Sequence, residues 1–143
     1  MSTISEDRKM IYHLFISHSW NYSDQYSNLI NMLDQAPRFQ YRDFSIPKND
    51  PVHSGSDAQL AAAIRNQMES CGVVIVMAGM YAKCSKWMEK EIRFAKSSWQ
   101  HPKPVLAVIP WGNERTSNDV TGRADKVVRW NTDSIVNAIR ELG

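Results

Sequence analysis

The chain has 143 residues, of which 43% are hydrophobic and 22% are charged, and its formal net charge is +2. This length is typical of one domain, and the composition is that of a globular protein, which excludes a disordered chain. The basic residues are scattered and form no run, so the sequence does not predict a nucleic-acid-binding stripe.

The first predicted elements are a strand and a helix. Residues 11–17 are rich in β-branched and aromatic side chains and predict a buried strand. A polar loop leads into a helix at about 23–35, in which Leu29 and Leu33 lie on one stripe. Pro37 ends this helix, because proline lacks a backbone N–H and clashes with the preceding turn.

A shorter strand at 39–44 is followed by a long connection at 46–57, which contains two prolines and a glycine. Connections of this length in compact domains are usually functional or mobile. A second helix then spans about 56–69, with Ser56 or Asp57 as its N-cap.

Two continuous apolar runs, at 71–77 and 103–110, predict strands that are covered on both faces of a sheet. Between them, the segment 84–99 has the apolar spacing of an amphipathic helix. Strands and helices therefore continue to alternate through the middle of the chain.

Near the C-terminus, residues 126–130 predict a further short strand, and 132–143 predict a helix capped by Thr132 or Asp133. Alternating strands and helices predict a parallel sheet with helices packed on both faces. We therefore expect a single α/β domain over residues 1–143, with a mostly parallel central sheet.

The N-terminal segment MSTISEDRKM is polar and mixed in charge, which is not typical of a signal peptide. The longest uncharged apolar run, at 71–82, is too short to span a bilayer. Cys71 and Cys84 match neither a metal-binding spacing nor a disulfide framework, so we expect two free, inert thiols. These observations predict a cytoplasmic protein that does not bind a membrane.

Motifs for several common activities are missing from the sequence. It contains neither GxxxxGK[ST] nor GxGxxG, the glycine-rich loops that bind phosphates. The four histidines form no HExxH motif and no cluster with cysteine, so we expect no metal site. There is no GxSxG motif, although Ser17 precedes His18. The strand at 71–77 also lacks the terminal carboxylate of a phospho-receiver domain.

In parallel α/β sheets, ligands bind in a crevice outside the carboxyl ends of the strands. Polar and aromatic side chains follow the predicted strands at these ends, or lie on the helix that leaves the third long strand. These candidate pocket residues are Ser17, His18, Ser19, Trp20, Asp43, Trp87 and Glu91.

Glu91 has an unusual position on its predicted helix. At 100° per residue, it lies about 40° from both Trp87 and Ala95, within an apolar arc that extends to Ile92. Glu89, by contrast, falls on the solvent side. A carboxylate in the first or second turn is also favoured by the helix dipole alone, and Trp87 is equally consistent with packing. Composition and periodicity leave both interpretations open.

The chain resembles TIR domains, and in particular the TIR-like branch of bacterial Thoeris antiphage defence. The resemblance covers residues 11–142, and three segments carry it. They are YHLFISHSW (12–20), in which a strand ending F-I-S enters a polar loop, YRDFSIPKNDPVH (41–53), which is similar to the loop that covers the pocket, and VVIVMAGMYAKCSKWMEKEI (73–92), which contains S-x-W-x-x-x-E.

This resemblance implies a flavodoxin-like TIR fold and an enzyme that breaks the bond between nicotinamide and ribose in NAD. Glu91 is then the catalytic residue, and NAD is a substrate, so no cofactor is expected. The implied substrate-binding residues are Ser17, His18, Ser19, Trp20, Asp43, Ile46 and Trp87. In the Thoeris branch the product is a cyclic ADP-ribose isomer, which signals to a separate effector protein.

The chemistry of this bond suits a carboxylate. Nicotinamide in NAD is already a cationic leaving group, so its departure requires neither a metal nor a strong general acid. The ribose left behind resembles an oxocarbenium ion, whose positive charge a carboxylate stabilises. This stabilisation is stronger in a partly dry pocket than in water, which is consistent with the apolar surroundings expected for Glu91.

Two other functions remain open. A non-catalytic module would assemble with other TIR domains through the loop at 46–57 and through exposed helix charges, although Lys48 stands where the wider TIR pattern has a glycine. A nucleoside deoxyribosyltransferase also uses a carboxylate in a similar layout, and it would act on free nucleosides instead of NAD. None of these functions involves nucleic acid or a membrane as a partner.

Overall fold

The computed structural model describes residues 11–17, 24–44, 56–77, 86–97, 99, 102–109 and 124–143. Its strands are β1 (Ile11–Ile16), β2 (Gln40–Asp43), β3 (Val73–Met77), β4 (Val105–Ile109) and β5 (Lys126–Arg129). Its helices are α2 (Asp24–Gln35), α3 (Asp57–Glu69), α4 (Lys86–Ser97) and α6 (Thr132–Leu142). Each strand and helix predicted from the sequence is present, with its ends close to the predicted ones.

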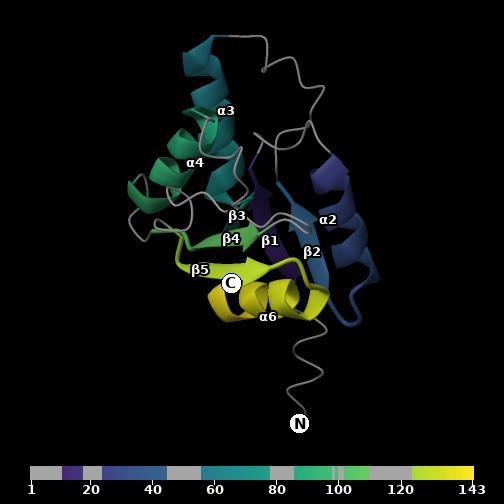
Figure 1. Ribbon diagram of the computed structural model, residues 1–143. Helices are drawn as coiled ribbons and strands as arrows, with labels where there is room; N and C mark the ends of the chain where they lie inside the picture. Colours follow the sequence, from purple (N-terminus) through teal and green to yellow (C-terminus); the bar gives the residue numbers. More distant parts are fainter. Residues whose placement is uncertain are drawn as a thin grey trace.

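The strands form one five-stranded sheet in the order β2-β1-β3-β4-β5 (Figure 1). All of its described pairings are parallel. The register places Leu14 of β1 opposite Asp43 of β2, and Ile16 of β1 opposite Ile75 of β3. The α/β class is therefore confirmed, and the described sheet is entirely parallel where the sequence predicted a mostly parallel one.

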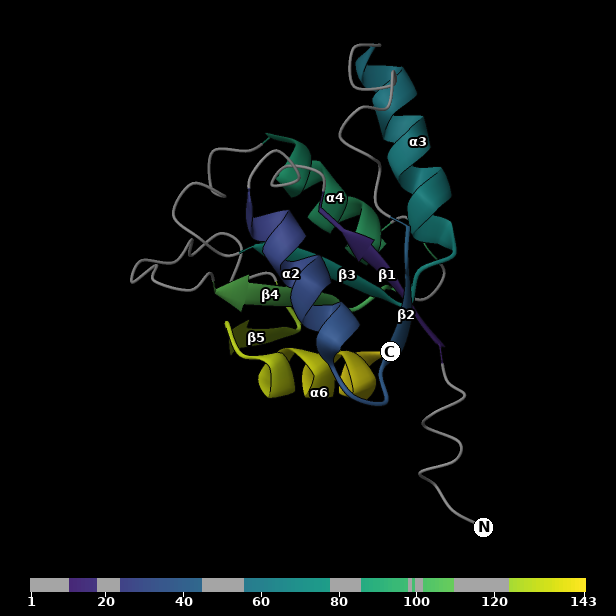
Figure 2. The ribbon, with the colours of Figure 1, turned by 90° about the vertical axis from the view of Figure 1, so that its right-hand side faces the viewer.

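Helices cover both faces of the sheet, with α2 and α6 on one face and α3 and α4 on the other (Figures 1 and 2). Successive residues of a strand point to opposite faces, so Leu14 and Ile16 belong to the first core and Phe15 belongs to the second. Because β1, β3 and β4 are covered on both faces, they carry the continuous apolar runs of the sequence.

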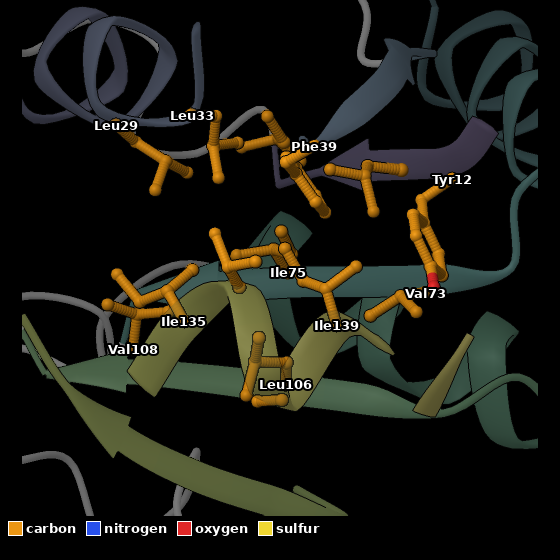
Figure 3. Packing of buried hydrophobic residues seen from close by; sticks show 14 of the residues in the cluster. Tyr12, Leu29, Leu33, Phe39, Val73, Ile75, Leu106, Val108, Ile135 and Ile139 are labelled. Carbon is orange, nitrogen blue, oxygen red and sulfur yellow. The ribbon is translucent and has the colours of Figure 1, made fainter. Parts of the chain in front are cut away.

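The first core lies between the sheet and the helices α2 and α6 (Figure 3). Each fully buried aliphatic side chain in it contributes about 1.5–3 kcal/mol relative to exposure, so the two cores stabilise the packing of the helices on the sheet. The apolar stripe predicted at Leu29 and Leu33 is confirmed, because both side chains are fully buried. The fully buried side chains on α3 and α6 are Ile64, Met68, Ile135 and Ile139.

Ser56 is the N-cap of α3, as predicted. Its Oγ accepts a hydrogen bond from the backbone N–H of Gln59 at 3.1 Å, and the Gln59 side chain accepts one from the backbone N–H of Ser56 at 2.9 Å. This reciprocal capping box satisfies two backbone donors that the helix itself leaves unpaired.

The predicted cap of α6, Thr132 or Asp133, is wrong. Asn131 is the N-cap, and its side-chain oxygen accepts a hydrogen bond from the backbone N–H of Ser134 at 3.0 Å. Asn131 has an extended backbone, with φ −156° and ψ 129°, whereas Thr132 already belongs to the helix. All three residue types are good caps, so the backbone conformation decides which one acts.

Among the described residues, no helix is both long enough and apolar enough to cross a membrane.

Candidate functional site

The strand order creates a topological switch point between β1 and β3. From β1 the chain passes through α2 to β2 on one side, and from β2 it passes through α3 to β3 on the other side of β1. Ligands of open parallel sheets bind in the crevice outside the carboxyl ends of the strands at such a point. The candidate site therefore lies at the carboxyl ends of β1 and β3.

Ser17 follows the last residue of β1 and lies at this switch point. Its backbone N–H donates a hydrogen bond of 2.9 Å to the carbonyl oxygen of Ile75 in β3. Ser17 is fully buried, and it is the one buried polar residue in the described part of the chain. Among the predicted substrate-binding residues whose side chains the structure describes, Ser17 alone lies at the switch point.

Asp43 ends β2 at the edge of the sheet and is exposed. It lies opposite Leu14, three residues before Ser17, which corresponds to about 10 Å along β1. The structure therefore does not bring Asp43 and Ser17 to the same level of the sheet.

α4 carries Trp87 and Glu91 within its first two turns. Ile92 is 3% exposed and Ala95 is fully buried, whereas Arg93 is exposed, which confirms the apolar and solvent sides predicted for this helix. Along the helix backbone, Glu91 precedes Ala95 by about one turn. The side chains of Trp87 and Glu91 lie outside the part that the structure describes.

The other predicted substrate-binding residues also lie outside the described ranges. They are His18, Ser19, Trp20 and Ile46.

The last turn of α4 is attached to the amino ends of β4 and β5. The backbone N–H of Lys103, just before β4, donates a hydrogen bond of 2.7 Å to the carbonyl oxygen of Ala95. Lys96 forms an ion pair with Asp125, just before β5. Because its last turn is held at the amino ends of these strands, α4 runs back along the sheet and its first turns lie toward the carboxyl ends.

Asp125 is held by more than the ion pair. Burial acts to raise the pKa of Asp125, but the hydrogen bonds from Lys96 and from the backbone of Val105, together with the charge of Lys96, hold that pKa below its usual value. No local motif in the sequence predicts the pair of Lys96 and Asp125, because the two residues are 29 positions apart.

A separate cavity lies at the opposite end of the sheet from the candidate site, at the amino ends of the strands. It has a volume of about 230 Å³ and lies between the starts of β1 and β3, and Cys71 is among its lining residues. Burial raises the pKa of the Cys71 thiol to about 11, against the effect of the nearby Lys103 ammonium. A thiol that stays protonated at neutral pH is a poor nucleophile, so the structure supports the inert role expected for Cys71.

Within the described residues, no group of three His, Cys, Asp or Glu side chains is arranged to hold a metal ion.

A parallel sheet in this strand order, with helices on both faces and a candidate site at the β1/β3 switch point, defines a flavodoxin-like α/β protein. Clostridium botulinum CMP N-glycosidase, BcmB, has a similar structure, with a TM-score of 0.53 and 11% sequence identity, over 90% of this chain and 98% of that chain. The flavoenzyme NAD(P)H:(acceptor) oxidoreductase FerB from Paracoccus denitrificans has a TM-score of 0.47 and 13% identity, over 93% of this chain and 98% of that one. At 11% identity, the likeness to BcmB shows the fold alone.

Residues 15–115 match the family described as Thoeris protein ThsB, TIR-like domain. The chain belongs to this family, so the resemblance stated from its motifs is confirmed, and the protein is a TIR-like module of Thoeris defence. No curated protein sequence matches the chain.

Proposed function

We propose that this chain is an enzyme that cleaves the nicotinamide–ribose bond of NAD and then cyclises the product, with Glu91 as its catalytic carboxylate. One observation carries the proposal: Glu91 lies in the second turn of α4, the helix that follows β3 at the switch point, in a chain of the ThsB TIR-like family. The place of Ser17, at the end of β1 and beside β3, is consistent with the same location for the substrate.

In the first step, the bond between C1′ of the ribose and the pyridine nitrogen breaks. Its electron pair leaves with nicotinamide, which becomes neutral, and the ribose takes the positive charge. The carboxylate of Glu91 stabilises this charge as it develops, which is the type of electrostatic stabilisation that lowers barriers most in enzymes. No separate cofactor is needed, because NAD itself supplies the leaving group.

In the second step, a hydroxyl group of the adenosine part of the same molecule forms a bond to C1′ and releases its proton to solvent. The products are then nicotinamide, a cyclic ADP-ribose isomer and one proton. If water attacks instead, the product is ADP-ribose. The cyclic product would act as a signal to a separate effector protein, in keeping with the Thoeris family of this chain.

The test compares wild type with Glu91→Gln, and with Glu89→Gln as the matched control from the same helix. Each protein is incubated with NAD and phage-infected lysate, and nicotinamide and cyclic products are measured by chromatography and mass spectrometry. We expect Glu91→Gln to lower nicotinamide release by about 10²-fold or more, because a charge-stabilising group is lost, and Glu89→Gln to stay close to wild type. Equal release by wild type and Glu91→Gln contradicts the proposal.

The same assay separates the alternative functions. Free nucleosides and CMP are offered as additional substrates, because BcmB, which shares the fold, is a CMP N-glycosidase. Turnover of these substrates instead of NAD would favour a nucleoside-processing enzyme. If no substrate is turned over, and light scattering detects self-association that Glu91→Gln does not change, a non-catalytic TIR module is favoured.

A further inference from the structure

Asp125 is a fixed point at the start of β5. Its backbone N–H donates a hydrogen bond of 2.9 Å to the carbonyl oxygen of Val105, and its carboxylate accepts one of 2.7 Å from the backbone N–H of Val105. The carboxylate is thus tied to the backbone of β4, next to which β5 pairs in parallel. The same carboxylate oxygen that accepts from Val105 also pairs with Lys96 of α4.

Lys103 is a second fixed point, which is bonded to the backbone of the last turn of α4. Its backbone N–H donates to the carbonyl oxygen of Ala95 at 2.7 Å. Its ammonium donates to the carbonyl oxygens of Glu69 at 3.1 Å and Cys71 at 2.8 Å. Glu69 is the last residue of α3, and Cys71 lies two positions before β3. Two polar contacts therefore attach α4 to points that are themselves bonded to other elements.

These polar contacts fix the position of α4 along its axis, which its apolar face specifies only weakly. Ile92 and Ala95 hold the helix against the sheet, but hydrophobic contact is non-directional and specifies the position along the helix axis weakly. A hydrogen-bonded ion pair requires a defined distance and direction between its two groups. The pair of Lys96 and Asp125 therefore selects one axial position of α4 relative to the sheet.

We propose that Lys96 and Asp125 are positioning residues that set the axial position of α4, and thereby the position of Glu91. This inference rests on the proposed catalytic role of Glu91. Glu91 precedes Lys96 by five residues in one continuous helix, about 7.5 Å along its axis, so a shift at Lys96 is passed on to Glu91.

The expected signature is a loss of rate without a loss of folding. A partly exposed ion pair contributes little to stability, and the two side chains here are 32% and 40% exposed. A misplacement of about 1 Å at a reacting group, by contrast, lowers a rate by up to about 10²-fold. Stability and activity should therefore respond very differently to the loss of this pair.

The test uses Lys96→Met and Asp125→Asn, with Lys96→Arg as the conservative variant. Lys126→Met is the matched control, because Lys126 also forms a lysine–carboxylate ion pair, with Glu141, but joins β5 to α6 on the other face of the sheet. The two side chains of this pair are 37% and 62% exposed. In the NAD assay with phage-infected lysate, kcat and KM are measured, and amide hydrogen exchange of residues 86–97 is followed by mass spectrometry.

We expect Lys96→Met and Asp125→Asn to lower kcat by about 10-fold with KM within about 2-fold of wild type, and to speed amide exchange in α4. Lys96→Arg should recover most of kcat, and Lys126→Met should match wild type. If Lys96→Met keeps wild-type kcat while Glu91→Gln does not, the positioning role is wrong and the proposed function stands.

If wild type itself releases no nicotinamide, the proposed function fails, and amide exchange decides the positioning role alone. Unchanged exchange over 86–97 in Lys96→Met then overturns it, whereas faster exchange in Lys96→Met and not in Lys126→Met supports it.

Discussion

The backbone N–H of Ser17 donates a hydrogen bond of 2.9 Å to the carbonyl oxygen of Ile75. This bond continues the β1–β3 ladder past Ile16, the last residue of β1, so the end of β1 is fixed against β3 at the switch point. The wall of the candidate site is therefore built from backbone in the rigid centre of the sheet.

Replacement of Ser17 by alanine tests whether its hydroxyl serves the substrate. We expect Ser17→Ala to lower kcat/KM for NAD cleavage by about 3- to 10-fold, the effect of one lost hydrogen bond, and to change the free energy of unfolding by about 1 kcal/mol. Ser97→Ala is the control, since the exposed Ser97 hydroxyl bonds the carbonyl oxygen of Arg93 at the far end of α4. Wild-type kcat/KM in Ser17→Ala would leave Ser17 a purely structural residue.

Lys103→Met should destabilise the fold. It removes a charged donor from the carbonyl oxygens of Glu69 and Cys71 and a cation from the end of α3, which has no basic residue in its own last turn. We expect the free energy of unfolding in urea to fall by about 1–3 kcal/mol. Lys126→Met, which breaks an exposed ion pair, should lower it by less than about 1 kcal/mol. Equal losses in the two variants would contradict the bridging role of Lys103.

The raised pKa of the Cys71 thiol predicts that the protein loses stability at high pH. This pKa is 9.0 when unperturbed and about 11 in the folded state, so the folded state holds the proton more tightly. The resulting stabilisation is fully present below pH 9 and is lost as the pH rises through about 11. It amounts to about 2–3 kcal/mol.

The measurement is the free energy of unfolding between pH 8 and pH 11, about the range of the shift, in a Cys84→Ser background that leaves Cys71 as the one thiol. The added variant Cys71→Ala should show a smaller fall over this range, because it lacks the titrating group. Native protein in the Cys84→Ser background should also react slowly with a disulfide reagent at about pH 8, because the Cys71 thiol is still protonated there. Rapid labelling would refute the buried, protonated state.

Arg38 has a positive backbone φ of 57°, in the turn between α2 and β2. This conformation costs about 1–2 kcal/mol for a residue with a Cβ atom, and glycine avoids most of that cost. We expect Arg38→Gly to raise the free energy of unfolding by up to about 1 kcal/mol, and the β-branched Arg38→Val to lower it by about 1 kcal/mol or more.

The two Arg38 variants differ from wild type mainly in the backbone preference of residue 38. The hydrogen bond from the Arg140 side chain goes to the backbone carbonyl oxygen of Arg38, so both variants keep it. Urea midpoints of the three proteins measure the order. If the Arg38→Val protein is as stable as the Arg38→Gly protein, the positive φ of residue 38 does not lower the stability of the fold.

Local patterns predicted most of the secondary structure. The apolar runs at 71–77 and 103–110 correspond to β3 and β4, and the short segment at 126–130 corresponds to β5. The cap of α6 was missed, because Asn131, Thr132 and Asp133 are three consecutive residues that all favour this position, and only the backbone path from β5 distinguishes them.

The candidate site was predicted in part. The motif singled out Glu91, and its place on α4 agrees with the burial of Ile92 and Ala95. The level of Asp43, about 10 Å behind Ser17 along the sheet, was not predictable, because it depends on the register between β1 and the short edge strand β2.

By itself, the sequence determined the alternation of strands and helices, the side of each helix that is buried, and the family motif around Glu91. These follow from periodicity and residue chemistry within about one turn or one strand. Only the tertiary structure decided the strand order, the meeting of Ser17 with Ile75, and the pairing of Lys96 with Asp125. Such contacts join residues far apart in the chain, and they exist only once the sheet has brought the ends of its strands together.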